Sequence, residues 1–384
     1  VKPLLTQLDH EDPKVVKATI WALGKIGADP VLSEGPPPVR VSDTLAAYCR
    51  RILAANGQAA PSSVDLLAAA ARALGSLRRD EPTPVVIELL AALVDHKDGN
   101  VRFETASALG PLASERAFRV LLQRVDVEPE INVRRAILGS IGRQARASVA
   151  HVPSAVHTLV PFLFNTREEL QPLRQESQYA LVPLAKQPDL VGLSAILDAI
   201  EAHGGDPATL EPVARSFLGF LPEFDAEDLS RLSEPVRRRY YALLARRAAV
   251  RLRDEPAKAL ADYSDVLSGR GWHTVDAIDA ASLPIFLGKA KALLTIPAKR
   301  PKEAFGIAEA CLDHKATAET WGVTLDALEV LKQTTPAELP PLLERMGKRI
   351  GAAPEEVRKR YEALRRPGKP SQSKAPSGTS GEGA

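Results

Sequence analysis

The sequence has 384 residues, which is more than one ordinary hydrophobic core needs and indicates either two domains or one elongated array. Hydrophobic residues make up 45% of it and charged residues 26%, but aromatic residues only 5%, a composition typical of packed helices. The formal net charge of +2 argues against nucleic acid or a membrane surface as the main partner. No apolar run is long enough to cross a bilayer, and no secretory signal is recognisable.

The first residue and the cysteines bear on the compartment. The chain starts at Val1 and its single methionine is Met346, so we expect a processed or truncated chain. The cytoplasm is the default location, and export stays open. Cys49 and Cys311 lie in different halves and match no disulfide or zinc pattern, which predicts two small core residues. The sequence leaves the oligomeric state open.

Five segments of the chain repeat one helical pattern. Each has an aliphatic residue at position zero, a small residue at seven, an aliphatic one at eight and glycine at nine, where the last segment has Val182 instead. At 100° per residue, positions zero, four, seven, eight and eleven fall within about 100°, the width of a core-facing stripe. The pattern therefore predicts five amphipathic helices. Position zero is Val15, Leu66, Val101, Val133 or Leu173.

A second apolar helical run precedes each of these segments. The runs are residues 2–8, 43–55, 84–95, 114–125 and 153–164. Two alternating helices per unit, none able to bury its apolar face alone, predict an all-α solenoid of stacked antiparallel helix pairs. The longest interval between units contains three consecutive prolines at 36–38, so residues 28–41 are predicted to be an inserted loop.

The second helix of the unit resembles that of the HEAT family, including the HEAT-like repeats of phycobilisome lyases. The best match is Asp98-Gly-Asn-Val101-Arg102 followed by Ala108-Leu109-Gly110, and the resemblance covers residues 1–186. It implies an α-solenoid and leaves the function open. It also implies that the arginines at the family's conserved position bridge adjacent repeats by pairing with carboxylates or carbonyls. These arginines are Arg102, Arg134 and Arg174.

The second half of the chain is predicted to be helical by composition rather than by motif. We expect a helical-hairpin region over 187–366, with helices near 189–203, 207–221, 234–253, 256–268, 281–296, 301–313, 316–333, 336–350 and 354–366. The small residues Ala257, Ala261 and Ser264, and likewise Ala304, Ala308 and Cys311, faintly resemble the tetratricopeptide repeat. Residues 367–384 contain no aliphatic residue larger than alanine, which predicts a disordered tail.

No catalytic, cofactor or metal motif is recognisable. Asp9-His10-Glu11-Asp12 and Asp95-His96-Lys97-Asp98 occupy the same turn in two repeats, where a metal or acid-base role competes with helix capping. Capping is favoured because turns prefer aspartate and the other repeats lack the set. We therefore predict a protein that is not an enzyme and binds no cofactor or metal.

The candidate binding residues lie at positions two, six and ten, which point away from the core stripe. Cations and aromatics gather there, and these types dominate the energetics of protein interfaces. Burial between neighbouring repeats is the alternative for the three aromatics, and the sequence does not decide between the two. The candidates are Lys17, Trp21, Lys25, Phe103, Arg135, Arg143 and Tyr179.

A second candidate set is basic. Arg239, Arg246 and Arg253 recur every seven residues and could form one line that contacts an anion such as a phosphate. Salt bridges to nearby carboxylates such as Asp262 are the alternative.

These observations favour a non-enzymatic scaffold or adaptor that binds another protein along its stacked helix pairs. Two alternatives remain open. One is nucleic-acid binding through local basic stripes. The other is an accessory or lyase-type enzyme of the HEAT-like class, for which no catalytic residue can be matched.

Overall fold

The structure is a computed structural model. It describes residues 1–33, 38–55, 61–77, 83–165, 167–187, 190–203, 224, 226–272, 274–275 and 278–366. Apart from two short strands, the regular structure in this part of the chain is helical, which confirms the all-α prediction. The chain divides into two compact units, Val1–Leu243 (unit 1) and Leu244–Ala384 (unit 2). The predicted tail and the predicted helix over 207–221 lie outside the described residues.

The repeat region of unit 1 consists of helix pairs. The first helices are α1 (Lys2–Thr6, continued by the 3₁₀ turn Gln7–Asp9), α3 (Val41–Ala55), α5 (Pro84–Leu93), α7 (Glu115–Val125) and α9 (Val152–Leu163). The second helices are α2 (Pro13–Lys25), α4 (Pro61–Ser76), α6 (Gly99–Leu109), α8 (Ile131–Ala147) and α10 (Gln171–Ala185). Short 3₁₀ turns, Val149–His151 and Glu168–Leu170, precede α9 and α10. These helices agree closely with the predicted segments.

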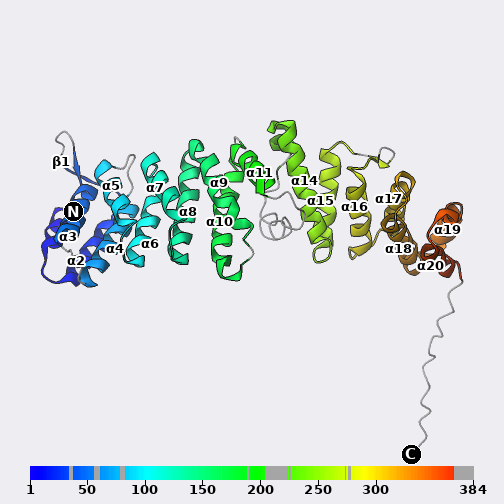
Figure 1. Cartoon of the computed structure of the whole chain (residues 1–384), viewed down its shortest axis with the longest axis horizontal. Helices are drawn as coiled ribbons and strands as arrows, with labels where there is room; N and C mark the ends of the chain where they lie inside the picture. Colours follow the sequence, from blue (N-terminus) through cyan, green and yellow to red (C-terminus); the bar gives the residue numbers. More distant parts are fainter. Residues whose placement is uncertain are drawn as a thin grey trace, which may run out of the picture. The chain divides into compact units, whose positions relative to one another are not determined.

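The second helices form one continuous layer. Helix α2 packs on α4, α4 on α6, α6 on α8 and α8 on α10, and they follow one another in chain order from blue to green in Figure 1. Each also packs on the first helix of its own repeat. One face of every second helix is therefore buried against the first helices, and the inner ones (α4, α6 and α8) have a neighbouring second helix on each flank. In the described part of the chain, the remaining face of the layer packs on no other helix.

Glycine at position nine meets the small residue at position seven of the next repeat. A Cβ added to Gly75 would lie 2.6 Å from Ala108 Cα, and one added to Gly142 would lie 2.6 Å from Ala180 Cβ. Gly24 has Ala73 Cα and Cβ at 3.0 Å from the same position. Real Cβ atoms essentially never approach to 2.6 Å and seldom to 3.0 Å, so glycine at position nine allows the two helices to pack closely at these three junctions.

Residues 28–41, predicted to be an inserted loop, contain a small antiparallel β-ribbon. Strand β1 (Val31–Ser33) pairs with β2 (Val39–Arg40), and α3 begins at Val41 directly after β2. Asp29 is buried and accepts hydrogen bonds from Ser42 N at 2.9 Å and Ser42 Oγ at 2.6 Å. Both ends of the insertion are thus fixed to the first turn of α3. The sequence missed the ribbon because strands this short show no alternation.

Unit 1 extends beyond residue 186, where the repeat motif fades. Helix α11 (Val191–His203) packs on α9 and α10. Further on lie α13 (Ala226–Arg231) and α14 (Glu234–Arg251), the helix within which the two units divide. Helix packing therefore continues beyond the residue at which the repeat motif ends. The domain boundary between residues 186 and 187 was drawn from the motif alone and stays a prediction.

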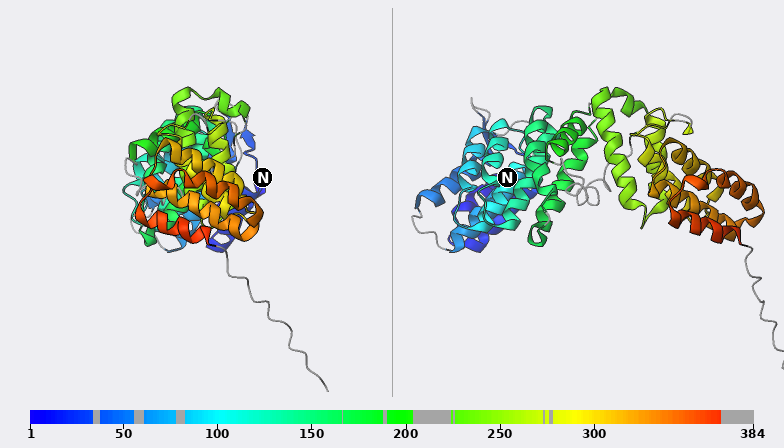
Figure 2. Two further views of the ribbon diagram at one scale, coloured as in Figure 1. Left: turned by 90° about the vertical axis from the view of Figure 1, so that its right-hand side faces the viewer. Right: turned by 45° about the vertical axis from the view of Figure 1, so that its right-hand side comes forward.

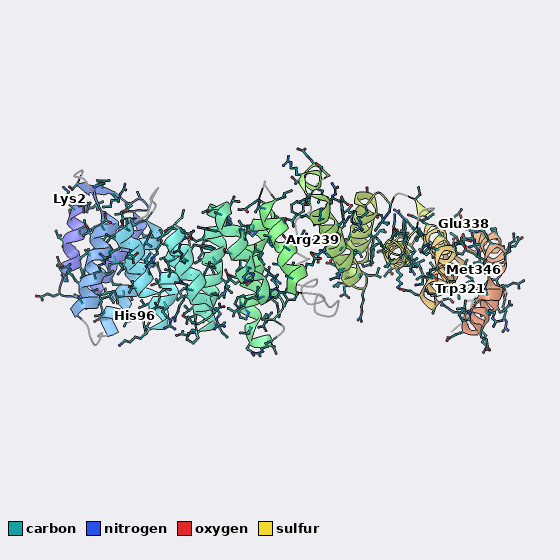
Figure 3. The ribbon with its side chains drawn as sticks, turned by 45° about the horizontal axis from the view of Figure 1, so that its top comes forward. Lys2, His96, Arg239, Trp321, Glu338 and Met346 are labelled. Atoms are coloured by element: carbon teal, nitrogen blue, oxygen red, sulfur yellow. The ribbon has the colours of Figure 1, made fainter. Side chains whose placement is uncertain are left out.

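Unit 2 contains consecutive antiparallel helices around a large hydrophobic core, with a smaller buried cluster beside it. They are α15 (Pro256–Gly269), α16 (Leu283–Thr295), α17 (Pro301–His314), α18 (Ala318–Thr334), α19 (Leu339–Gly347) and α20 (Glu355–Arg365), with 3₁₀ turns at Pro336–Glu338 and Ile350–Ala352. Each of α15 to α18 packs on the next along the chain, seen from yellow-green to orange in Figure 2. Trp321 and Met346, labelled in Figure 3, belong to the large core.

The small-residue patterns of unit 2 do not behave alike. Ala304, Ala308 and Cys311 are buried on α17, whereas Ala257 and Ala261 are exposed on α15. In α15 the packed face is made instead by larger residues that include Tyr263 and Val266. The small residues that resemble the tetratricopeptide repeat are therefore all buried only in α17.

Each unit holds one cysteine, and both are buried free thiols, as predicted for core residues. Burial raises the pKa of Cys49 and of Cys311 to about 12. At pH 8 only about one thiol in ten thousand would then be ionised. We expect neither cysteine to react with iodoacetamide until its own unit opens, a result that mass spectrometry of labelled peptides would check. Rapid labelling of the native protein would contradict the burial.

Candidate functional site

The three aromatic candidates are exposed. Trp21 on α2 is 61% exposed, Phe103 on α6 is 37% exposed and Tyr179 on α10 is 64% exposed. They are the exposed aromatic side chains among the described residues, and all three lie on second helices of unit 1. The alternative that neighbouring repeats bury them is therefore wrong. Core packing does not account for an aromatic residue at these three positions, because their rings are exposed to solvent.

Lys17, Trp21 and Lys25 lie together in a hollow between α2 and α4. The hollow has a volume of about 380 Å³ and is also lined by Arg72 and Ser76 of α4. Its remaining lining consists of the small residues Gly24, Ala69 and Ala73. The structure thus groups three predicted candidates and adds a fourth cationic or aromatic side chain, Arg72.

Phe103, Arg135 and Arg143 lie together in a wider groove between α6 and α8. The groove has a volume of about 620 Å³, and its other polar residues include Glu130 and Glu176. Arg135 Nε lies 3.1 Å from Glu176 Oε2, which joins α8 to α10. The groove therefore carries both charges beside an exposed aromatic ring, unlike the hollow between α2 and α4.

Gly139 gives the side chain of Glu176 room to cross α8. A Cβ added at Gly139 would lie 2.5 Å from Glu176 Oε1. The carboxylate thereby reaches the stretch of α8 between Arg135 and Arg143, one helical turn to either side. Glycine inside a helix costs about 1 kcal/mol relative to alanine, and this crossing accounts for its presence.

Arg143 donates to a hydroxyl group of its own helix, whereas Arg135 pairs with a carboxylate of α10. Arg143 Nη2 donates to Ser140 Oγ at 2.6 Å, and its Nε lies 2.5 Å from where a Cβ of Gly110 would be. Burial of the guanidinium lowers the pKa of Arg143, and the nearby carboxylate of Glu176 offsets only part of that shift. Gly110, at position nine, therefore makes room for a side chain of the next repeat rather than for its backbone.

Tyr179 lies outside both cavities. It occupies position six of α10, on the same free face of the layer. The seven candidates therefore share one layer, but the structure brings together only two groups of three.

Arg102 forms a buried junction between two repeats. Its Nε and Nη2 donate to the two oxygens of Glu128 at 3.0 and 2.9 Å, and Nη2 also donates to Glu130 Oε1 at 2.8 Å. Its Nη1 donates to the carbonyls of His96 and Lys97 at 3.0 and 2.9 Å. All five N–H groups of the guanidinium are therefore satisfied.

Glu128 completes this junction as a fully buried carboxylate. Its burial alone would raise its pKa, but hydrogen bonds from Arg102, from the backbone N–H of Glu130 and from Arg124 outweigh burial and lower it below the usual value. Arg134 and Arg174 differ from Arg102, since they donate to the carbonyls of Glu128 and Asn165 within their own repeats. Bridging between repeats is thus shown for Arg102 among the three arginines.

Comparisons with known proteins agree with this architecture. Residues 58–142 match the family model described as HEAT repeats. This part of the chain contains HEAT repeats. The matched part runs from just before α4 to the middle of α8 and covers the second, third and fourth of the five repeated segments. Comparison with curated proteins gave no match.

Among solved structures, the chain is similar to an engineered protein whose crystal structure was a target of the Northeast Structural Genomics Consortium. The two are 17% identical, the alignment covers 94% of this chain and 97% of that chain, and the TM-score is 0.36. The HEAT assignment rests on the family match and on the helix pairs described above. Among the described helices, none is both long enough and apolar enough to cross a membrane.

The histidines in the turns of two HEAT repeats have a structural role. His10 Nδ1 accepts a hydrogen bond from Asp12 N at 2.9 Å, and His96 Nδ1 accepts one from Asp98 N at 3.1 Å. Asp12 and Asp98 then cap α2 and α6 by accepting from backbone N–H groups of the first turn. Figure 3 shows His96 at the lower edge of the ribbon. In the described residues, no three His, Cys, Asp or Glu side chains are grouped to hold a metal ion.

The basic line predicted outside the HEAT repeats is not continuous. Arg239 on α14 pairs with Asp198 and with Glu201 of α11, the latter at 3.2 Å. Arg246 is exposed on α14, and Arg253 is exposed beyond the end of that helix. Because the three residues are divided between the two units, the structure defines no common site for them.

The neighbouring arginines of α14 follow the salt-bridge alternative. Arg247 forms a buried, two-pronged pair with Asp262, with bonds of 3.0 and 2.6 Å. Arg251 adds a bond to Asp262 Oδ2 at 3.1 Å. These cations hold α14 to α15 and are not available to an outside anion.

Sequence reasoning missed three residues of the HEAT-repeat face: Arg72, Gly139 and Glu176. Arg72 and Gly139 occupy position six of their segments, so the same positional rule could have found both. Arg72 pairs with Glu104 across α4 and α6 through two hydrogen bonds. Glu176, at position three, carries no signal in the repeat pattern.

Proposed function

We propose that this chain is a non-enzymatic scaffold that binds another protein along the free faces of α2, α4, α6, α8 and α10. The observation that carries the proposal is the location of the exposed aromatic residues: within the described chain, all three lie on these five helices. Exposed aromatic and arginine side chains are the types enriched where interfaces gain most of their binding energy. HEAT repeats supply the extended surface that such a contact needs.

The charge distribution supports a protein partner over nucleic acid. Several cations of the face already pair with carboxylates of the next helix, as in Lys17 with Asp65 at 3.0 Å and Arg135 with Glu176 at 3.1 Å. A nucleic-acid surface requires an excess of unpaired cations along the backbone path. The overall charge of +2 points the same way. The absence of enzymatic activity is part of the proposal.

Replacing three residues of the face should abolish capture of the partner. The variant combines Trp21→Ala, Arg135→Gln and Arg143→Gln, and we expect its affinity to fall by about a hundredfold or more because hot-spot residues each contribute a tenfold factor or greater. The partner would first be identified by crosslinking and mass spectrometry of the intact gene product in its own cell. Affinity for the purified partner would then be measured with both forms of the chain.

The matched control is Arg119→Gln on α7, a first helix outside the face, where Arg119 forms an exposed pair with Glu115 at 3.3 Å. It should leave both helicity and affinity unchanged. If the triple variant binds the partner as tightly as the parent, the face is not the binding surface. Binding of a DNA or RNA duplex with an affinity that falls steeply with salt would favour the nucleic-acid alternative.

A further inference from the structure

The hollow between α2 and α4 differs in charge from the rest of the face. Its lining includes the cations Lys17, Lys25 and Arg72 and no carboxylate. The partners of Lys17 and Arg72, which are Asp65 and Glu104, lie outside that lining. The wider groove between α6 and α8, in contrast, contains two glutamates beside its two arginines.

Lys25 is the cation of the hollow that is available to a ligand. Its ammonium lies 5.4 Å from the centroid of the Trp21 ring, a cation–π distance. In the part of the chain that the structure describes, it has no ion-pair or hydrogen-bond partner. The pair formed by Lys17 and Asp65 is exposed on both sides, so its exchange for another carboxylate costs little.

The bottom of the hollow is apolar and without long side chains. Gly24, Ala69 and Ala73 line it, and a Cβ added to Gly24 would lie only 3.0 Å from Ala73 Cα. The indole ring of Trp21 stands beside this surface and is 61% exposed. An apolar side chain placed here would contact the ring on one side and the alanines beneath it, which removes apolar surface from water.

We infer that this hollow binds a short acidic segment of a partner protein that presents one apolar side chain to Trp21 and its carboxylates to Lys25 and Lys17. The inference rests on the proposed function and adds the chemistry of the partner. A short acidic segment fits better than a nucleic acid, because the cations are confined to one small hollow and two of the three are already paired, so no continuous line of unpaired cations is offered to a phosphate backbone. The contact joins charge complementarity to a single apolar anchor.

The test uses the full chain and a set of fluorescein-labelled peptides of about ten residues, titrated by fluorescence anisotropy. The first peptide has a Leu-Phe centre flanked by glutamates, the second replaces the glutamates with glutamines, and the third replaces Leu-Phe with Gly-Gly. We expect the first to bind at least about tenfold more tightly than either of the others. Its affinity should fall as salt is added.

Two variants locate the binding. Lys25→Glu and Trp21→Ala should each weaken the acidic peptide by about tenfold or more, with unchanged thermal unfolding because both side chains are exposed. Lys2→Glu makes the same charge change on α1, outside the hollow, and should have no effect; Lys2 is labelled in Figure 3.

Equal affinity for the glutamate and glutamine peptides would overturn the inference. So would an unchanged affinity in Lys25→Glu, no saturable binding at about 1 mM peptide, or an oligonucleotide that displaces the acidic peptide more strongly than the peptide itself. Loss of the natural partner in the triple variant, together with no binding of the acidic peptide, would leave the proposed function standing and remove only this inference. Binding of the acidic peptide by the parent chain, together with full retention of the natural partner by the triple variant, would leave the peptide site standing and remove the proposed function.

Discussion

Replacing Arg102 with methionine should lower the free energy of unfolding of unit 1 by about 3–5 kcal/mol, because the change leaves the carboxylate of Glu128 buried without its two-pronged partner. Glu128 is fully buried and Arg102 nearly so. The substitution also removes the donors to the carbonyls of His96 and Lys97. Urea unfolding followed by circular dichroism would measure the loss, and Arg102→Lys should recover only part of it, since an ammonium cannot reproduce the five-donor fork.

Two further variants make this prediction specific. Arg119→Met breaks an exposed pair with Glu115 and should cost about 1 kcal/mol or less. Adding Glu128→Gln to Arg102→Met removes a buried charge that retains Arg124 as its cationic partner, and should restore part of the lost stability. A cost for Arg102→Met no larger than that for Arg119→Met would show that the junction does not hold the repeats together.

The second large effect is expected at Gly75. Alanine is the better helix former by about 1 kcal/mol, so at an open helical site Gly→Ala would stabilise. At Gly75, however, the added methyl would lie 2.6 Å from the backbone of Ala108, and neither backbone can yield without separating α4 from α6. Gly75→Ala should therefore destabilise unit 1 by about 1–3 kcal/mol, the usual cost of overpacking.

The two cysteines provide a separate measurement for each unit. Helix α3, which carries Cys49, packs on α4, so Gly75→Ala should speed labelling of Cys49 by about five- to hundredfold and leave Cys311 unchanged. The control is Gly322→Ala on α18, where nothing lies within 4 Å of the added Cβ, and it should slow labelling of Cys311. Slower labelling of Cys49 in Gly75→Ala would mean that the helix contact is looser than the structure shows.

The sequence predicted the helices well because the signal for them is local and repeated. Five copies of one spacing, with caps such as Asp12 and Asp98 at the starts, define both the period and the boundaries. A close contact at position nine was also predictable, since glycine inside a helix costs stability and so indicates that another group packs against it. Whether that group is a backbone, as at Gly75, or a side chain, as at Gly110, was not predictable.

Exposure of the aromatics could not be decided in the same way. The helical period gives the direction of Trp21 around its own helix but not whether a neighbouring helix covers that direction. In the structure the adjacent second helices cover only the flanks of each helix, so the side chain at position six is exposed to solvent on α2, α4 and α10. Which side chains meet across helices, such as Glu176 with Arg135, depends on the offset between repeats, and no pattern within one repeat contains that offset.

Glycine at position nine and a small residue at position seven give α2, α4, α6 and α8 two unlike edges, whereas α10 has Val182 at position nine. The contact is head-to-tail: the glycine edge of one repeat accepts the alanine edge of the next, and two identical edges would not mesh in the same way. An array joined in this manner has a direction, and its length can change by whole repeats without redesign of the junctions, since Gly24 could face Ala108 as well as Ala73. The junction of α6 and α8 is the exception, because Gly110 there accommodates Arg143. Duplication or loss of repeats is thus compatible with the junctions before α6, whereas the repeats that build the groove around Phe103 must stay adjacent.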